Sequence, residues 1–305
     1  MFYNKSFTIA SLLEVGAHYG HRKNYWNPKV AEYIYCIHNK IHIINLEKTA
    51  KCLESALTAL KDVAYKNGRI LFVSTKKQAA DTIAEQATRC GQYYVNNRWL
   101  GGMLTNWKTV SSSIKTLNDY EQKLTDEDNT LLKKEKLVLN RKRDKLHKVL
   151  GGIRKMGGVP DALFVIGLYK NENIVREAKA LNIPVFAIID TNCKLDGIDH
   201  IIPGNDDSRK AIELYCKLAA DAILLGMQES AEKSSSSFSA IGGTTKRSTK
   251  KSSSPVPPSS NHLKNKGSKA AITTKEKALS STQKTETKPA AKAKATATAA
   301  ATTTT

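Results

Sequence analysis

Two blocks of this chain repeat the same order of a short apolar run, a helical stretch and a second short run. In the first block, "RILFVS" at 69–74 precedes "KKQAADTIAEQATRCG", which has helical spacing and a terminal glycine, and "QYYV" at 92–95 follows. Short branched apolar runs are typical of strands buried on both faces, and glycine commonly follows a helix. The alternation predicts an α/β fold, in which helices cover both faces of a parallel sheet.

The second block repeats this order further along the chain. "DALFVIG" at 161–167 is predicted to be a strand, "NENIVREAKALN" a helix and "IPVFAIID" at 183–190 another strand. A last helix is expected from about Ser208 to Gln228, with Asp206 or Asp207 near its N-terminus.

Leucines at heptad spacing fill the segment between the two blocks, residues 105–150. One register holds Leu117, Leu124, Leu131 and Val138, and a second holds Leu132, Leu139 and Leu146. The polar "TDEDN" at 125–129 lies between two helical stretches and predicts an antiparallel coiled-coil hairpin roughly 30 Å long that projects from the sheet domain. Its basic half, "KKEKLVLNRKRDKLHK", fits either a solvated helix face or a docking surface for RNA or protein.

Basic residues dominate the composition, with 48 Lys and Arg against 28 Asp and Glu, a net charge of +20. Residues 231–305 hold 14 Lys and Arg against 3 Asp and Glu, a net of +11, which leaves about +9 for the body. This Ser-, Thr-, Ala- and Lys-rich tail is expected to be disordered, as a solvated tail or a loose nucleic-acid tether. The excess charge favours phosphate-rich partners.

The predicted organisation is a sheet domain of residues 1–104 and 151–230, a hairpin insertion at 105–150 and a tail at 231–305. Five scattered cysteines without a CxxC pair argue against disulfides and a structural zinc site, and fit a reducing compartment. We find no apolar run of about 18 residues and no secretory or transit peptide, so no membrane association is expected.

The sequence around the first strand argues against a nucleotide enzyme. "TKKQAA" follows Ser74, so neither GxGxxG nor GxxxxGK[ST] brings backbone N–H groups to a phosphate. Cys193 is interpreted as structural, and the pair His18 and His21 lacks further ligands for a metal. We therefore expect no catalytic residue, no metal, no cofactor and no small-molecule substrate.

Cations near aromatic and amide side chains are the remaining candidates, and they suit RNA because Arg binds phosphate and aromatic rings stack on unpaired bases. The predicted RNA-binding residues are Arg22, Lys23, Trp26, Lys76, Lys77, Arg98, Trp99, Asn106, Lys108, Arg154 and Lys155. Gly101 and Gly102 are interpreted as a flexible joint before the hairpin, with Trp99 either bracing this joint or facing RNA.

Three long motifs resemble the bacterial-type small-subunit ribosomal protein S-two family. They are "LLEVGAHYGHRKNYWNPKVAEYIYCIHNKIHIINLEKT", "ILFVSTKKQAADTIAEQATRCGQYYVNNRWLGGMLTNWKTV" and "IPVFAIIDTNCKLDGIDHIIPGNDDSRKAI". The resemblance runs from about residue 5 to 228. It departs at "KLD", where Asp-Pro-Asp is more usual, and at Tyr19, where Phe is more usual.

This resemblance implies a flavodoxin-like parallel sheet with an inserted coiled-coil hairpin. It further implies a non-enzymatic structural constituent of the small ribosomal subunit, which binds ribosomal RNA at the head–body junction. The implied partners are small-subunit ribosomal RNA, neighbouring small-subunit proteins and the mRNA-binding protein S-one. The implied location is the ribosome of the bacterial cytoplasm or, as the alternative, of an organelle that encodes the protein itself.

Overall fold

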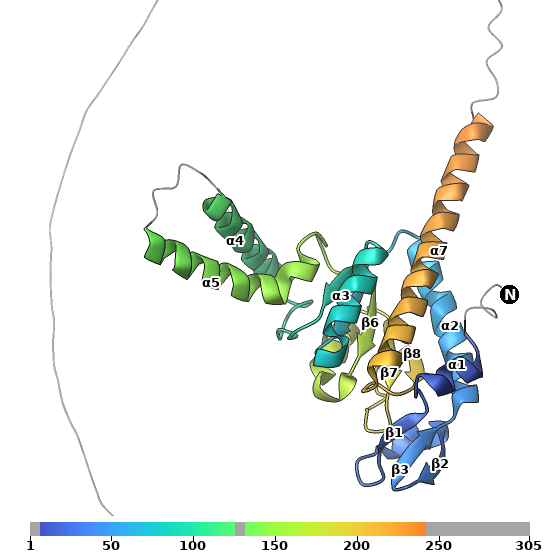
Figure 1. Cartoon of the computed structure of the whole chain (residues 1–305). Helices are drawn as coiled ribbons and strands as arrows, with labels where there is room; N and C mark the ends of the chain where they lie inside the picture. Colours follow the sequence, from blue (N-terminus) through green and yellow to red (C-terminus); the bar gives the residue numbers. More distant parts are fainter. Residues whose placement is uncertain (1–6, 126–131, 242–305) are drawn as a thin grey trace, which may run out of the picture. The chain divides into compact units, whose positions relative to one another are not determined.

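A five-stranded parallel sheet organises the fold (Figure 1). The computed structural model describes residues 7–125 and 132–241, with side chains described as far as Lys233. The strands are β4 (Ile70–Ser74), β5 (Tyr93–Val95), β6 (Ala162–Ile166), β7 (Val185–Ile189) and β8 (His200–Pro203). Their order in the sheet is β5-β4-β6-β7-β8, which is 2-1-3-4-5 in chain order, as in flavodoxin. The predicted parallel α/β sheet is confirmed.

Helices cover both faces of this sheet, because alternate residues of each strand enter different cores. Phe72 belongs to a core shared with α2 (Leu46–Tyr65), α3 (Ala80–Arg89) and α7 (Arg209–Ile241). Val73 belongs to a second core, shared with α6 (Glu172–Ala180). All residues of β4, β6 and β7 are buried, which explains why their sequences are apolar except for Ser74 at the end of β4.

The N-terminal part forms elements that the sequence pattern did not predict. These are α1 (Ile9–Glu14), β1 (Tyr19–Arg22), the 3₁₀ helix η2 (Pro28–Tyr33), β2 (Ile34–His38), β3 (Ile41–Ile44) and α2. The three strands form a small antiparallel sheet in the order β1-β3-β2. Asn45 caps the N-terminus of α2: its side-chain oxygen accepts hydrogen bonds from the backbone N–H groups of Glu47 and Lys48.

The C-terminal end of α3 was predicted correctly, whereas that of α7 was not. Gly91 ends α3 with a left-handed φ of +66°, as the sequence indicated. Helix α7 instead continues past Gln228 to Ile241, through the predicted boundary at residue 230. Gly226 is a packing position on α7 and not a terminator, because an added Cβ would lie 2.4 Å from the Lys61 carbonyl oxygen of α2. Residues 242–305 of the expected tail lie outside the described residues.

Two helices are inserted between β5 and β6, where the hairpin was predicted. They are α4 (Trp107–Thr125) and α5 (Lys133–Leu150), and the 3₁₀ helix η4 (Gly151–Ile153) leads back to the sheet. Helices α4 and α5 contact each other, with Leu117 buried and Leu146 half-buried. Towards the other end, Leu132 and Val138 are 69% and 43% exposed, and Leu131 lies outside the described residues. Continuous coiled-coil packing along both helices therefore stays a prediction.

None of the helices in the described part has both the length and the apolar character needed to cross a membrane.

Candidate functional site

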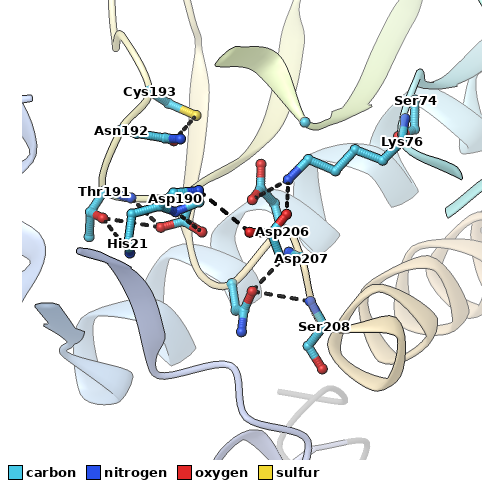
Figure 2. A network of polar contacts seen from close by, with 12 residues as sticks. His21, Ser74, Lys76, Asp190, Thr191, Asn192, Cys193, Asp206, Asp207 and Ser208 are labelled. Atoms are coloured by element: carbon cyan, nitrogen blue, oxygen red, sulfur yellow. Dashed lines mark hydrogen bonds and ion pairs between the residues drawn. The ribbon is translucent and has the colours of Figure 1, made fainter. Parts of the chain in front are cut away.

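The carboxyl ends of three parallel strands bring charged side chains together at one edge of the large sheet (Figure 2). Lys76 follows β4, Asp190 follows β7, and Asp206 with Asp207 follows β8. His21 reaches the same place from β1 of the small sheet. This edge is where doubly wound sheets commonly bind ligands.

Ion pairs connect these five side chains into one network. The His21 Nδ1 atom lies 2.9 Å from an Asp190 oxygen, and its Nε2 atom lies 3.4 Å from Asp207. The Lys76 Nζ atom lies 2.6 Å from Asp206 and 2.6 Å from Asp207 (Figure 2). The Asp190 and Asp206 side chains are 1% exposed, so both carboxylates need these partners.

Backbone contacts hold the small sheet against this edge. Thr191 accepts a hydrogen bond from the His21 backbone N–H at 2.9 Å. A Cβ at Gly20 would lie 2.6 Å from the Thr191 methyl group, so the close approach of β1 needs glycine there. The Asn205 amide nitrogen also donates to the Gly16 carbonyl at 3.0 Å. The position of His21 is therefore fixed by both sheets.

The network shifts the pKa values of its members. The hydrogen bond that the His21 ring donates to the Asp190 carboxylate raises the pKa of His21 above its ordinary value, although burial opposes the charged form. Burial raises the pKa of Asp206, and the neighbouring Asp190 carboxylate adds to this effect. Burial also disfavours the charged Lys76, but its pairs with Asp206 and Asp207 outweigh burial and raise its pKa.

The cluster contains donors of the kind that bind divalent cations. One ligand atom from each of His21, Asp190, Asp206 and Asp207 lies within 4.8 Å of the others. An imidazole with carboxylates suits zinc and related metals, and the Lys76 ammonium faces two of the carboxylates here. Sequence analysis considered His21 with His18 and missed the carboxylates, because only folding brings residues 190, 206 and 207 beside residue 21.

An open pocket of about 810 Å³ adjoins the network. Its lining combines aromatic and cationic side chains, including Tyr25, Trp26, Lys77, Tyr169 and Lys170. Cys193, which sequence analysis considered as a nucleophile, does not line this pocket. The Cys193 side chain is fully buried, and burial raises the pKa of its thiol to about 12, so the thiolate is scarce at neutral pH.

A second polar centre fixes the loop that leads into α4. Glu177 of α6 is 9% exposed, and one carboxylate oxygen accepts hydrogen bonds from Trp99 Nε1 at 3.0 Å and Gly102 N at 2.9 Å. The other oxygen accepts from Leu104 N at 2.9 Å and from Thr105 N at 3.5 Å. Trp99 therefore braces this loop, and the interpretation of Gly102 as a flexible joint is wrong: its φ of +80° serves an anchored turn.

The predicted RNA-binding residues divide into three that a charged side chain engages, of which Arg154 is itself exposed, and eight that no ion pair engages in the described part of the chain. Lys76 and Trp99 are engaged in the two centres above, and Arg154 pairs with Glu121 at 2.5 Å. The other eight are exposed: Arg22, Lys23, Trp26, Lys77, Arg98, Asn106, Lys108 and Lys155. Trp26 and Lys77 line the 810 Å³ pocket together with Lys76. The others lie at the end of β1 and around the base of the inserted helices, so the structure does not gather all eight at one point.

Comparisons with known proteins give one consistent result. A sequence model of ribosomal protein S2 matches residues 12–226. The chain is 60% identical over 229 residues to small ribosomal subunit protein uS2 of Wolbachia pipientis wMel, covering 74% of this chain and 81% of that protein. It is 53% identical over 228 residues to uS2 of Ehrlichia ruminantium (strain Gardel), with 75% and 80% covered. For uS2 of Neorickettsia sennetsu the identity is 54% over 230 residues, with 75% and 77% covered.

Proposed function

Because this chain belongs to the ribosomal protein S2 family, whose members are structural and not enzymatic, we propose that it binds ribosomal RNA at the head–body junction of the small subunit. Its role in translation is then to hold folded RNA and neighbouring small-subunit proteins in place. The network around His21 stabilises the protein in this proposal and performs no reaction. The location is the ribosome of the bacterial cytoplasm, or that of an organelle encoding the protein.

The observation that carries this proposal is a set of exposed cations without acidic partners. Within residues 7–125 and 132–241, no ion pair engages Arg22, Lys23, Lys77, Arg98, Lys108 or Lys155, although the nearby Lys76 and Arg154 are paired. An unpaired surface cation is free to replace the counterions of a phosphate group, and this release drives binding to nucleic acids.

The exposed side chains suit RNA more than a small ligand. Lys and Arg contacts to phosphates supply affinity, and the folded shape of the RNA supplies selection. Trp26 is 41% exposed beside Arg22 and Lys23 in sequence, so it offers a ring to an unpaired base. Lys76 has two ion pairs and Trp99 donates to Glu177, so the proposal assigns the RNA contacts to the exposed residues in preference to these two.

Sedimentation with small subunits lacking this protein tests the proposal. The full chain is expected to co-sediment at low salt and to dissociate steeply as salt rises. A double Arg22→Gln, Lys23→Gln variant should bind more weakly with a shallower salt dependence. A matched Lys51→Gln, Lys66→Gln variant changes two exposed lysines of α2 and the residue after it, and should bind nearly as the wild type does. A wild-type chain that stays free of subunits at low salt refutes the proposal.

We further propose that the protein supports docking of the mRNA-binding protein S-one. The supporting feature is the 810 Å³ pocket with Tyr25, Trp26 and Tyr169 in its lining, since exposed aromatic rings are favourable contacts for a protein segment. Tyr169→Ser subunits should then retain this protein but bind S-one less well. If these subunits and wild-type subunits bind S-one equally well, the pocket does not contribute to S-one docking.

A further inference from the structure

The outer face of α5 carries a row of cations at helical spacing. Arg141, Lys145 and Lys148 are separated by four and three residues, so they lie on one face of the helix. All three are exposed, whereas Leu139 and Leu146 on the opposite face are partly buried. The row spans about 10 Å along the helix axis, at roughly 1.5 Å per residue.

These three charges are not neutralised within the part of the chain that the structure describes. The two acidic residues of α5 are engaged elsewhere: Glu135 accepts from the Leu132 backbone N–H at 3.2 Å, and Asp144 pairs with Arg143 at 2.5 Å. On α4, Glu121 is paired with Arg154. Adjacent like charges at this spacing lower the stability of a helix, so the row is unfavourable unless an external anion approaches it.

The base of α5 is held in place, which fixes the positions of the cations. Leu150 is buried, and Leu146 and Val149 pack against the core that the sheet shares with α6. The Asn97 amide also donates to the Lys148 carbonyl oxygen at 2.9 Å. Asn97 precedes the exposed Arg98, so the end of the row lies next to the loop that follows β5. A preorganised row of charges binds with a smaller entropic cost than a flexible one.

We propose that Arg141, Lys145 and Lys148 contact the phosphate backbone of double-helical RNA, and this inference rests on the proposed ribosomal function. Helix α5 contains no Phe, Tyr or Trp, and its single aromatic ring, that of His147, is not part of the row, so unpaired bases find little stacking surface along the three cations. Side chains cannot read the bases in the deep, narrow major groove of A-form RNA, so a duplex offers a helix mainly its phosphates and, in the shallow minor groove, its ribose hydroxyls. The chemistry of the row therefore matches a duplex backbone and not a single strand.

The test uses the full chain with Arg141, Lys145 and Lys148 all changed to Gln, and a 20-base-pair RNA duplex as the probe. The logarithmic salt slope of binding is expected to fall by about 2 to 3, close to one per lost phosphate contact, and low-salt affinity by about tenfold or more. A matched variant changes the exposed Lys51, Lys66 and Lys217 to Gln and should alter both much less. Circular dichroism is used to check that both triple variants keep their helices. Arg141→Lys retains the positive charge and should keep wild-type binding.

Equal duplex affinity and equal salt slopes for the two triple variants would overturn the inference. A second variant, with Leu132 and Leu137 changed to Ser, tests for a protein partner on the same helix. The inference is also overturned if this variant loses subunit association while the Gln variant keeps it. If the wild type joins no subunits, the proposed function fails, but duplex binding that depends on the three cations still supports their assignment.

Discussion

The indole Nε1–H of Trp99 donates a hydrogen bond to the Glu177 carboxylate, with 3.0 Å between Nε1 and Oε1. The same carboxylate accepts from three backbone N–H groups of the loop that leads into α4. A Gln side chain has one oxygen and an amide group that cannot accept, so it leaves some of these donors unpaired. We expect Glu177→Gln to lower the free energy of unfolding by about 2–4 kcal/mol, measured by urea denaturation.

Glu172 of the same helix is the control for this substitution. Its ion pairs with Lys194 and Arg176 lie at the surface, where such pairs contribute little. Glu172→Gln should therefore change the free energy of unfolding much less than Glu177→Gln does. Similar losses for the two variants would show that the loop does not depend on the Glu177 carboxylate.

The pair of His21 and Asp190 predicts a pH dependence of stability. The pKa of His21 is raised above 6.5 in the folded chain, so its contribution is complete below that pH and is lost as pH rises through the folded value. His21→Gln should reduce the free energy of unfolding by about 1–2 kcal/mol more at pH 6 than at pH 9. His38→Gln, at an exposed position of β2, is the control. A loss from His21→Gln that is the same at both pH values contradicts the charged pair.

The elements that sequence analysis predicted well are those with a strong local pattern. Strands β6 and β7 are entirely apolar, β4 is apolar up to its last residue, Ser74, and Gly91 marks the end of α3. The small sheet was missed because β2 is largely exposed, so its sequence shows no buried alternation. Sequence analysis could not show which of the predicted cations form ion pairs within the protein. Whether Lys76 meets Asp206 depends on the order of strands in the sheet.

Gly152 and Gly101, which both lie near the inserted helices, should respond differently to substitution by alanine. A Cβ at Gly152 would lie 2.1 Å from the Tyr94 carbonyl oxygen, whereas a Cβ at Gly101 meets nothing within 4 Å. Gly152→Ala should lower the free energy of unfolding by about 2 kcal/mol or more, because backbone atoms must move apart. Gly101→Ala should stay within about 0.5 kcal/mol of the wild type. Equal unfolding midpoints for the two variants in urea would contradict the close approach.

Removal of residues 242–305 is expected to affect RNA binding without affecting stability. They hold most of the basic excess of the tail and few large apolar residues, so the core described above does not require them. A chain ending at Ile241 should keep its thermal unfolding midpoint and lose part of its salt-sensitive affinity for ribosomal RNA. A large fall in the midpoint would instead show that these residues contribute to packing.

The neighbours Lys76 and Lys77 provide the sharpest contrast, because only one of them faces the buried carboxylates. Removing Lys76 leaves Asp206, which is 1% exposed, without its cation, and loss of one partner of a buried pair typically costs about 3–5 kcal/mol. Lys77 is exposed and unpaired in the described structure, so its charge is available to phosphate. Lys76→Gln should therefore lower stability strongly, whereas Lys77→Gln should leave stability unchanged and reduce the salt slope of ribosomal RNA binding by about 1. Urea denaturation and salt titrations on both variants separate the two effects. Weaker RNA binding by folded Lys76→Gln, without such a change for Lys77→Gln, would reverse the assignment.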